Sequence, residues 1–376
     1  MKDELGWTPG PECEAVSTES PGRDGALRRP SAPRSLGGLR VVAIGGGTGL
    51  PVVLAGLKRT LLATEPRGAP PDPERLTAIV TVADDGGSSG RLRRAYGVLA
   101  PGDIRNCLLA LSSDGAMSRL FGFRFSGDGD VAGHSLGNLI LTALSLVHGD
   151  FSEAVKRAEE ILGVRGRVLA STTQSVALVG ELEDGGTIRG ESAIGQACGR
   201  ARRIRLEPED APLLPEAREA LRRADLVVIG PGSLYTSLLP PLLLREVPDA
   251  VAESGARVVL VMNVMTEGET LGLSAAGHLR ALRRHAPQLP LHDVLLNTTP
   301  IARRVLARYG ARGSFPVACD DRQVADLGCR PVKRRLLAVS RKIRHDPRAV
   351  AAALLEVIAG QGPGPPAAAL VAQAGI

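Results

Sequence analysis

The sequence has few aromatic residues and few lysines. Phe, Tyr and Trp make up 2% of its 376 residues, which leaves few rings to stack on the bases of a nucleic acid. Lys and Arg number 46 against 40 Asp and Glu, for a formal net charge of +6, but almost all of these basic residues are arginines. An excess of arginine over lysine also accompanies GC-rich coding sequences. A net positive charge suits an acidic partner. The scarcity of aromatic residues and the excess of arginine over lysine argue against nucleic acid, and we expect no nucleic-acid partner.

Cysteine and long apolar runs are also scarce. The cysteines number 5, an odd count, and none forms a CxxC pair: Cys13, Cys107, Cys198, Cys319 and Cys329. This argues against a disulfide framework or a zinc knuckle and fits a reducing compartment. No run reaches the roughly 18 apolar residues that span a bilayer, and the acidic N-terminal stretch has no apolar core, unlike a secretory signal. We expect a cytoplasmic protein that does not insert into a membrane.

Low-complexity segments flank the part of the sequence that we expect to fold. Residues 1–38 are rich in Pro, Gly, Ser and charges of both signs and are predicted to be a disordered leader. Residues 360–376 form a similar tail. Between them, residues 39–359 are predicted to form a single large domain. The leader hydroxyls that a Ser/Thr kinase could modify are Ser17, Thr18 and Ser20.

Short apolar runs alternate with helical patterns along this domain. The runs that read as buried strands are 39–47, 76–87, 224–232, 257–264 and 292–299. The helical patterns are 50–63, 104–112, 135–147, 151–162, 214–223, 275–285 and 300–309. This alternation predicts a doubly wound α/β fold, a mostly parallel sheet with helices on both faces. Around the turn Asp184-Gly185-Gly186, residues 167–195 alternate apolar and polar, which predicts an antiparallel hairpin inserted in the main sheet or added to its edge.

A glycine-rich loop follows the first predicted strand directly. Gly46, Gly47, Thr48 and Gly49 stand between this strand and the helical pattern at 50–63. Glycines let backbone N–H groups approach an anion, and the N-terminus of the next helix adds a favourable dipole. The loop is neither GxGxxG nor a Walker A motif, and a tight strand-to-helix turn would explain it without a ligand. Its strand–turn–helix context nevertheless favours a site for the phosphates of a ligand.

A second loop of the same kind follows a later predicted strand. It contains Gly230, Gly232 and Ser233 and leads again into a helical pattern. Two such loops in one doubly wound domain suggest that they hold two ends of an extended, diphosphate-linked ligand. Asn263 and Asn297 each close another predicted strand, where a side-chain amide can bind a base or a sugar. Either could equally stabilise a turn.

Acidic and hydroxyl side chains gather at the end of the strand predicted at 76–87. They are Asp84, Asp85, Ser88 and Ser89, which we expect in a loop of small residues. Ligands of open α/β sheets bind at this end of the strands. Adjacent carboxylates and hydroxyls suit Mg²⁺ or ribose hydroxyls. Asp is also a good helix cap, but a cap alone does not need this combination, so we favour a role in binding.

The segment PGDIRN is predicted to begin a helix. Asp103 suits the N-cap, with Arg105 and Asn106 in the first turn. An arginine in the first turn opposes the helix dipole. Such a placement is easier to explain if the guanidinium faces a bound anion. A structural role and a binding role stay equally open for these residues.

The segment GHSLGNL carries a histidine and an asparagine four residues apart. His134 and Asn138 therefore share one face of the predicted helix. Gly137 costs about 1 kcal/mol inside a helix, so it suggests a close approach of two backbones. His134 and Asn138 are candidates to touch a ligand, and an ordinary structural histidine is the alternative.

Together these motifs resemble the gluconeogenesis factor family, bacterial proteins related to 2-phospho-L-lactate transferase. The segments that carry the resemblance keep the order of the family and are spread over about 41–345: GGGTGL, TVADDGGSSGRLR, PGDIRNCLLAL, GHSLGNL and GPGSLYTSLLP. The resemblance implies a Rossmann-like, three-layer α/β/α fold. It also implies binding of a UDP-sugar, typically UDP-N-acetylglucosamine, and control of carbon flow into cell-wall precursors and of cell shape.

The resemblance further implies roles for single residues. Tyr309 would stack on uracil or bond the ribose, and Arg344 would bind the diphosphate, since a guanidinium suits phosphate oxygens. In the transferase relatives the acidic residues at the strand end lie near a divalent metal, which points here to Asp84. Mg²⁺ is thus an optional cofactor, and none is required. Glu267 stands where the family commonly has Gln and adds negative charge to its loop.

Three functions are weighed at this stage. The favoured one is a UDP-sugar-binding regulator without catalysis, with partners in cell-wall precursor synthesis, self-association and phosphorylation as further expectations. The alternative is a phosphotransferase of the 2-phospho-L-lactate transferase type that uses a nucleoside-diphosphate donor. Its deazaflavin acceptor would favour aromatic walls, which this sequence can hardly supply. The third, RNA binding through the arginines at 200–205 and 330–335, rests on charge alone.

Overall fold

The computed structural model describes residues 36–64, 72–197, 201–338 and 342–360. The predicted leader, apart from its last residues, and the predicted tail, apart from Gly360, lie outside the described residues. So do the candidate phosphorylation sites Ser17, Thr18 and Ser20. Within the described ranges, no helix is both long and apolar enough to cross a bilayer.

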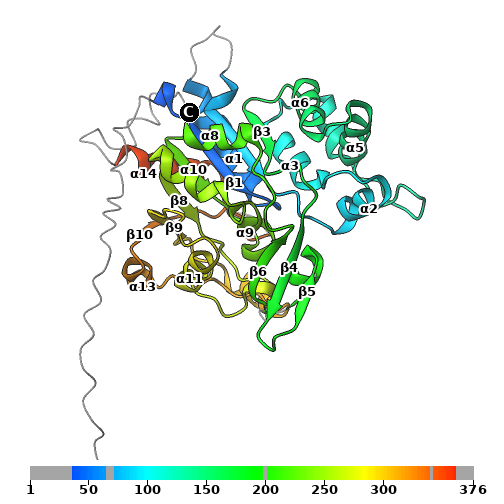
Figure 1. Ribbon diagram of the computed structural model, residues 1–376. Coiled ribbons are helices and arrows are strands. Elements are labelled where there is room, and N and C mark those ends of the chain that lie inside the picture. The colour runs from blue at the N-terminus through cyan, green and yellow to red at the C-terminus, as the bar shows by residue number, and fades with distance from the viewer. Residues whose placement is uncertain (1–35, 65–71, 198–200, 339–341, 361–376) are drawn as a thin grey trace, which may run out of the picture.

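A 7-stranded parallel sheet forms the centre of the molecule (Figure 1). Its strands lie in the order β10-β9-β8-β7-β1-β2-β3. Their bounds are β1 Val41–Gly45, β2 Leu76–Val80, β3 Arg167–Ala170, β7 Leu226–Ile229, β8 Arg257–Val261, β9 Asp293–Asn297 and β10 Arg330–Arg334. Every residue of β1, β2 and β7 is buried, as expected of strands covered on both faces. All five runs predicted as strands are confirmed.

The order of the strands determines where the loops of the sheet meet. From β1 the chain moves outward through β2 to β3, returns to the other side of β1, and continues outward from β7 to β10. In the register of the sheet, Val41 of β1 lies beside both Leu76 of β2 and Leu226 of β7. Because β2 lies on one side of β1 and β7 on the other, the strand order reverses between β1 and β7. In open α/β sheets, the crevice at the carboxyl ends of two such strands is the usual ligand site.

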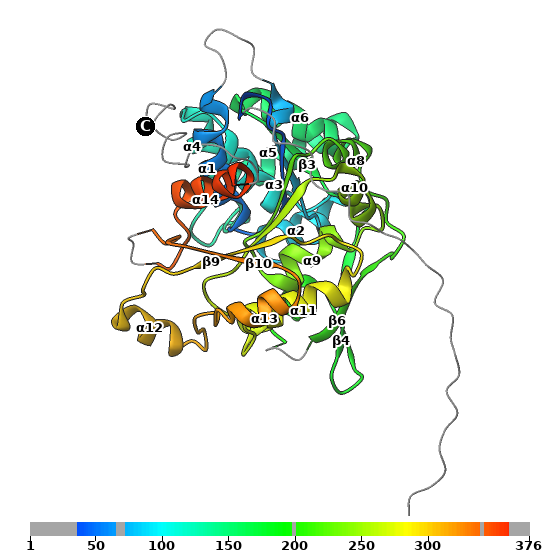
Figure 2. The ribbon, with the colours of Figure 1, turned by 90° about the vertical axis from the view of Figure 1, so that its left-hand side faces the viewer.

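Helices cover both faces of this sheet. In Figure 2, α1 and α14 lie on one side of the sheet and α11 and α13 on the other. The α-helices are α1 Leu50–Thr60, α2 Gly87–Tyr96, α3 Pro101–Leu111, α4 Ala116–Gly122, α5 Leu136–His148, α6 Phe151–Leu162, α7 Glu191–Gly195, α8 Pro215–Arg222, α9 Leu239–Leu242, α10 Glu246–Ser254, α11 Ala275–His285, α12 Arg303–Gly310, α13 Asp321–Asp326 and α14 Pro347–Ala359. Shorter helical turns are η1 Leu36–Gly38, η2 Leu62–Thr64, η3 Pro73–Arg75, η5 Gly268–Thr270 and the π-helical η4 Leu234–Leu238. The predicted doubly wound, three-layer fold is thus confirmed.

The stretch of small residues after β2 is a helix and not the predicted loop. Helix α2 begins at Gly87, and Ser88 and Ser89 lie in its buried first turn. At Gly90 an added Cβ would lie 1.8 Å from the backbone oxygen of Asp85. The small residues at the start of α2 therefore let this helix pack against the segment that leads into it. Their size reflects this packing, which a sequence pattern does not distinguish from a loop.

The predicted antiparallel hairpin exists but belongs to a sheet of its own. Strands β4 (Ala177–Leu182), β5 (Thr187–Arg189) and β6 (Ala201–Glu207) form a 3-stranded antiparallel sheet in the order β5-β4-β6. The expectation of a hairpin in the main sheet or on its edge is therefore corrected. Only β3, at the start of the predicted patch, joins the main sheet, where it runs parallel to β2. Strand β6 escaped prediction because its buried Ala201, Ile204 and Leu206 do not keep a strict alternation, since the register with β4 shifts at its start.

Helix α1 packs against the C-terminal helix α14 on the same side of the sheet. Gly56 of α1 faces the first turn of α14, where an added Cβ would lie 2.0 Å from the carbonyl oxygen of Pro347. Because Gly56 has no side chain, the backbone of α1 packs directly on the backbone of α14 where the two helices cross. The same contact fixes the position of the segment that precedes α14.

We expect Gly56→Ala to lower the free energy of unfolding by about 1–3 kcal/mol, because overpacking forces the two helices apart. Urea unfolding followed by circular dichroism measures this change. Gly195→Ala is the matched control, since a Cβ at that helical glycine meets nothing within 4 Å. Equal losses for the two variants would contradict the close packing of α1 on α14.

Candidate functional site

The two predicted glycine loops meet at the point where the strand order reverses. The loop after β1 crosses the loop after β7 so closely that a Cβ at Gly49 would lie 2.2 Å from the carbonyl oxygen of Pro231. Gly47 and Gly230 have positive φ angles of 66° and 74°, a region that favours glycine. At Gly46 an added Cβ would lie 2.5 Å from Thr81. Close packing or backbone conformation thus requires a glycine at each of these positions, before any ligand is considered.

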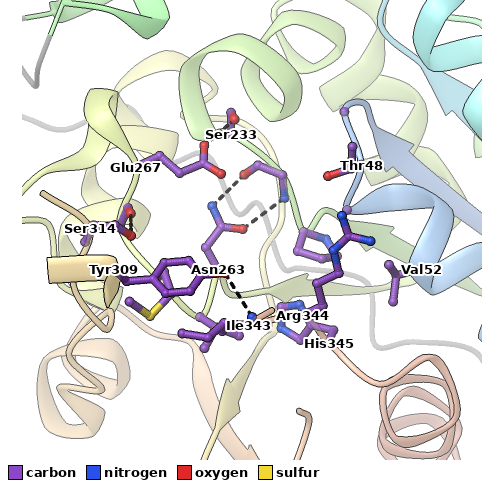
Figure 3. Close-up of a pocket in the computed structure, with 17 residues that line it drawn as sticks. Thr48, Val52, Ser233, Asn263, Glu267, Tyr309, Ser314, Ile343, Arg344 and His345 are labelled. Carbon is purple, nitrogen blue, oxygen red and sulfur yellow. Dashed lines mark hydrogen bonds between the residues drawn. The ribbon is translucent and has the colours of Figure 1, made fainter. Parts of the chain in front are cut away.

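A pocket of about 240 Å³ opens beside the crossed loops, and we call it the switch-point pocket (Figure 3). It draws residues from the carboxyl ends of β1, β7 and β8, from α12, and from the segment that precedes α14. The predicted site residues that line it are Gly47, Thr48, Gly49, Gly232, Ser233, Asn263, Tyr309 and Arg344. Residues more than 290 positions apart in the sequence thus share one pocket, as Thr48 and Arg344 do.

The side chain of Asn263 clamps the second glycine loop. Its Oδ1 accepts from the N–H of Gly232 at 3.1 Å, and its Nδ2 donates to the carbonyl oxygen of Gly232 at 2.8 Å. Asn297 likewise turns its own chain, since its Oδ1 accepts from the N–H groups of Thr299 and Leu336 at 3.0 and 3.1 Å. Asn263 therefore holds a neighbouring loop and Asn297 holds a turn, and the binding role of both amides stays a prediction.

Tyr309 and Arg344 are connected through the backbone. The hydroxyl oxygen of Tyr309 accepts from the N–H of Ile343 at 3.1 Å, which holds the residue before Arg344. In Figure 3 the side chain of Arg344 extends toward the glycine loop at Thr48. Of the side chains described around this pocket, Arg344 alone is an arginine or lysine. Burial lowers the pKa of the neighbouring His345 to about 4, so that side chain is neutral at pH 7.

A second group of predicted residues forms a buried polar cluster outside the switch-point pocket. Ser88 Oγ lies 2.9 Å from Nδ1 of His134 and accepts from Nδ2 of Asn138 at 2.9 Å. Arg105 donates to Oδ1 of Asn138 at 2.9 Å and to Oδ1 of Asn106 at 2.6 Å. Its guanidinium therefore meets amide oxygens here, and its Nε has no hydrogen-bond partner. Burial lowers the pKa of His134, and the charges of Arg91 and Arg124 lower it further.

Gly137 brings α5, the helix that carries Asn138, close to its neighbours. His134 precedes this helix, whose N-cap is Ser135, so the prediction that His134 and Asn138 share one helix face is wrong. A Cβ at this glycine would lie 2.6 Å from the carbonyl oxygen of Phe121 and 2.9 Å from the side chain of Arg105. The predicted close approach is therefore confirmed. It brings Asn138 within reach of Arg105, which joins α5 to α3.

The two aspartates after β2 have different roles. Asp85 caps α7 of the small sheet, because its carboxylate accepts from the N–H groups of Glu191 and Ser192 at 3.1 and 3.0 Å. Asp84 accepts from the N–H of Gly86 at 2.8 Å. The capping role weighed for this motif is thus present, but on a helix about 100 residues away in the sequence. Ser89 is buried in the first turn of α2.

Asp103 lies in the first turn of α3, which begins at Pro101 with Ala100 as its N-cap, so the predicted N-cap role of Asp103 is wrong. Its carboxyl group instead contacts the glycine loop after β1. Its Oδ2 accepts from the N–H of Gly47 at 2.7 Å. Burial raises the pKa of Asp103 to about 6, although the bond from Gly47 acts in the opposite direction, and the charge of Asp84 raises it further. One N–H group of the predicted phosphate loop is therefore held by a carboxyl group that takes up a proton in mildly acidic solution.

Two further carboxyl groups near the loops bind protons more tightly than usual. Burial raises the pKa of Glu191 to about 7 and that of Glu269 to about 7, and neighbouring carboxylates add to both shifts. The hydroxyl of Thr236, in η4, bonds with both groups. Glu269 also accepts from the N–H of Tyr235 at 2.9 Å. Helix η4 therefore begins beside the carboxyl groups of Glu191 and Glu269.

The described residues contain no group of three or more His, Cys, Asp or Glu side chains arranged to hold a metal ion. Asp84 alone therefore does not make a complete ligand set here. The Mg²⁺ ligand role of Asp84 stays a prediction, and we assign no step to a metal.

Several residues of the switch-point pocket were not predicted. They are Val52, Pro231, Val264, Met265, Thr266, Ser314, Ile343 and His345, together with Glu267, which the sequence marked only as a departure from the family pattern. Ser233 donates a hydrogen bond from its hydroxyl to the carboxylate of Glu267. The position of Glu267 shortly after the end of β8 could have identified it, since loops at that edge line the ligand site.

The crossed glycine loops and the pocket beside them define a doubly wound α/β protein with a pocket at the carboxyl edge of its sheet. The sequence profile described as 2-phospho-L-lactate transferase CofD matches residues 41–337. The chain belongs to this family.

Curated relatives carry a more particular name. The chain is 45% identical over 328 residues to a putative gluconeogenesis factor of Nostoc sp., covering 86% of this chain and 69% of the relative. It is 41% identical over 322 residues to the gluconeogenesis factor of Bacillus subtilis, covering 85% and 98%. A solved structure of a UPF0052 family member from Bacillus halodurans aligns with a TM-score of 0.78 at 42% identity, covering 85% of this chain and 100% of that one.

The raised pKa of Asp103 leads to a prediction about stability. An ordinary Asp in the unfolded chain titrates near 3.8, so between about pH 4 and 6 the folded protein binds more protons and its stability falls as the pH rises. The penalty reaches about 2–3 kcal/mol above pH 6. Asp103→Asn cannot ionise, so its free energy of unfolding relative to the wild type should increase over this pH range. Urea unfolding at several pH values measures the difference.

Asp150→Asn, at the exposed cap of α6, controls for the loss of a carboxylate from the surface. A difference between Asp103→Asn and wild type that is the same at pH 4.5 and pH 8 would show that Asp103 titrates normally.

Proposed function

We propose that this protein binds a UDP-sugar, UDP-N-acetylglucosamine in particular, in the switch-point pocket. We propose further that it acts there as a regulator of carbon flow into cell-wall precursors and of cell shape, without catalysing a reaction. The observation that carries the proposal is the convergence of two glycine loops, Arg344 and Tyr309 on one pocket. The name gluconeogenesis factor, carried by the relatives, supports a role in carbon metabolism.

The diphosphate has a matching environment on one side of the pocket. Thr48 and Gly49 precede α1, and the part of the chain that the structure describes gives their N–H groups no acceptor. The N-terminus of a helix attracts anions through its free N–H groups and its dipole. Arg344 faces this loop from the opposite wall (Figure 3). A guanidinium can bind phosphate oxygens through two parallel hydrogen bonds.

Polar groups for a sugar lie on another wall. Ser233 and Glu267 are joined by a hydrogen bond and both line the pocket. A carboxylate accepts hydrogen bonds from sugar hydroxyls, and a serine hydroxyl can donate or accept. Glu267 would repel a phosphate, so the anionic part of the ligand belongs beside Arg344 and the sugar hydroxyls beside Glu267.

The second candidate is transfer from a nucleoside-diphosphate donor, as the name of the family suggests. The observation that favours it is the carboxyl group of Asp103 at the N–H of Gly47, with Asp84 nearby. A carboxyl group beside a phosphate loop can position an acceptor alcohol or take its proton. Turnover of a nucleoside-diphosphate-linked phospho-acid by the purified protein would favour this candidate over the regulator.

The proposal predicts that UDP-N-acetylglucosamine stabilises the folded protein. At about 100 times its dissociation constant, a ligand adds roughly 2.7 kcal/mol to the free energy of unfolding. Differential scanning fluorimetry should therefore show a clear rise in Tm, with smaller shifts for GDP, a CDP-sugar and NAD at the same concentration. The absence of a shift with every UDP-sugar tested would overturn the proposal.

Substitutions in the pocket should separate binding from folding. Arg344→Ala removes charged hydrogen bonds worth about 1.5–3 kcal/mol, so we expect affinity for UDP-N-acetylglucosamine to fall by roughly 10- to 100-fold. Tyr309→Phe keeps the ring but loses the acceptor for Ile343 and should weaken binding less than Tyr309→Ala. Isothermal titration calorimetry measures all three.

Arg348→Ala is the matched control for charge, because Arg348 is exposed on the first turn of α14 and does not line the pocket. Its affinity should equal that of the wild type. If Arg344→Ala behaves in the same way, the diphosphate is not bound where we place it.

A further inference from the structure

A separate pocket lies at the opposite edge of the main sheet, where β1, β2 and β3 begin. It has a volume of about 190 Å³, and we call it the amino-edge pocket. Arg40 directly precedes β1, Thr77 is the second residue of β2, and Arg167 is the first residue of β3. None of the residues described in its lining also lines the switch-point pocket. Its occupancy is therefore independent of the proposed function.

Charged side chains of both signs make up most of this lining. Three arginines and three glutamates are joined by one threonine and one alanine: Arg40, Arg167, Arg223, Glu74, Glu216, Glu219, Thr77 and Ala220. With all six charged groups ionised, their charges sum to zero. A phosphate would meet as many negative as positive groups, and so would a metal cation. A molecule that carries one charge of each sign matches such a lining better, because each buried charge then finds a partner.

Ion pairs within the protein use part of these charges. Glu74 accepts a hydrogen bond from Arg40 at 2.5 Å and lies 3.5 Å from a guanidinium nitrogen of Arg223. The hydrogen bond from Arg40 lowers the pKa of Glu74, and the charges of Arg223 and Arg167 lower it further. Arg223 also pairs with Glu219 at 2.5 Å. Glu74, Glu219, Arg40 and Arg223 are thus already paired with one another.

Three other lining groups keep unused hydrogen-bonding positions. Arg167 lies 3.8 Å from Glu74, beyond hydrogen-bond distance, and its guanidinium makes no hydrogen bond to a described residue, although its side chain is only 23% exposed. The hydroxyl of Thr77, a residue that is 1% exposed, has no partner in the described ranges either. In the same part of the chain, the carboxylate of Glu216 forms no hydrogen bond and no ion pair. A cation, a hydroxyl and an anion of this pocket are therefore open to a ligand.

Glu159, on the other side of Arg167, does not supply the missing acceptor. Its carboxyl group accepts from the N–H of Val168 at 2.5 Å. Burial raises the pKa of Glu159 to about 7, although the bond from Val168 and the charge of Arg167 act in the opposite direction. Glu159 is therefore only partly ionised at neutral pH, and the N–H groups of Arg167 keep room for the carboxylate of a ligand.

The three open groups lie close to one another. Thr77 and Arg167 are partners in the register of β2 and β3. Arg167 and Glu216 line not only the amino-edge pocket but also a neighbouring pocket beside β3, which places the two side chains side by side. A positive and a negative group at such a short separation match a small molecule whose own two charges are only a few atoms apart.

We propose that the amino-edge pocket binds a small, polar α-amino acid in its zwitterionic form. The carboxylate of the amino acid accepts from the guanidinium of Arg167 and the hydroxyl of Thr77, and its ammonium group donates to Glu216. At about 30 Å³ for each water molecule, the pocket holds roughly six waters, so the ligand is compact. Ala220 is the sole apolar side chain described in the lining, so the side chain of the amino acid is small or polar.

The first experiment asks whether binding needs both charges of the ligand. Differential scanning fluorimetry of the full-length protein with each proteinogenic L-amino acid at about 10 mM, ten times a dissociation constant near 1 mM, should show a rise in Tm with at least one of them. Calorimetry should then show that the corresponding amide and the corresponding hydroxy acid bind at least about tenfold more weakly. No shift with any amino acid would overturn the proposal. A hydroxy acid or inorganic phosphate that binds as tightly as the amino acid would also overturn it.

Substitutions of the two charged groups locate the amino acid. Arg167→Gln and Glu216→Gln should each weaken its binding by roughly 10- to 100-fold. Because Glu216 has no ion pair within the described ranges, Glu216→Gln keeps the test valid even if Arg167→Gln does not fold. Arg222→Gln and Glu253→Gln are the matched controls, since they break an exposed ion pair of 2.9 Å outside the pocket and should bind as the wild type does. Unchanged affinity of Glu216→Gln would overturn the assignment.

Arg344→Ala distinguishes the two pockets. Arg344 lines the switch-point pocket and not the amino-edge pocket, so this variant should bind the amino acid with the affinity of the wild type. A loss of amino-acid binding in Arg344→Ala would place the amino acid in the switch-point pocket and overturn this inference. A wild-type protein that binds an amino acid but no UDP-sugar would overturn the proposed function and support this inference.

Discussion

The crossing of the two glycine loops at the carboxyl ends of β1 and β7 sets the geometry of the whole site. With Gly49 beneath the carbonyl oxygen of Pro231, no side chain can stand between the loops. Once they touch, Asn263 pairs with both backbone groups of Gly232, and Asp103 holds the N–H of Gly47. Some backbone groups of the glycine loops are thus bonded within the protein and are not free for a ligand. The remaining donors, with Arg344, define where an anion can bind.

Much of the fold can be read from the sequence because the central strands are buried on both faces. Runs such as those of β1 and β7 contain only apolar residues and glycine, and they are short and rich in β-branched residues, as is typical of strands covered on both faces. Strand β10, with the sequence RPVKR, could not be found in this way. It lies at the edge of the sheet, exposes its charged side chains, and is identified only by its pairing with β9.

Part of the lining of the switch-point pocket could be predicted from the sequence, but the separation of the candidate residues into a pocket and a buried cluster could not. Glycine loops, Tyr309 and Arg344 do line one pocket, as expected from the motifs and the family resemblance. The separate cluster around His134 and the capping of α7 by Asp85 depend on contacts between residues 46 to 107 positions apart. A short sequence motif does not show such long-range contacts. An aspartate that caps a distant helix occurs in the same kind of motif as an aspartate that faces a ligand.

The small antiparallel sheet is joined to the β2–α2 region by side chains of the main domain. Asp85 caps α7, and Arg93 of α2 donates to the carbonyl oxygens of Asp84 and Val176 at 3.1 and 2.8 Å. This has a consequence for attempts to divide the protein into smaller pieces. A chain shortened by removal of the small sheet with α7 would leave the carboxylate of Asp85 without these partners and would remove the acceptor of Arg93 at Val176. We therefore expect the small sheet to contribute to the stability of the β2–α2 region.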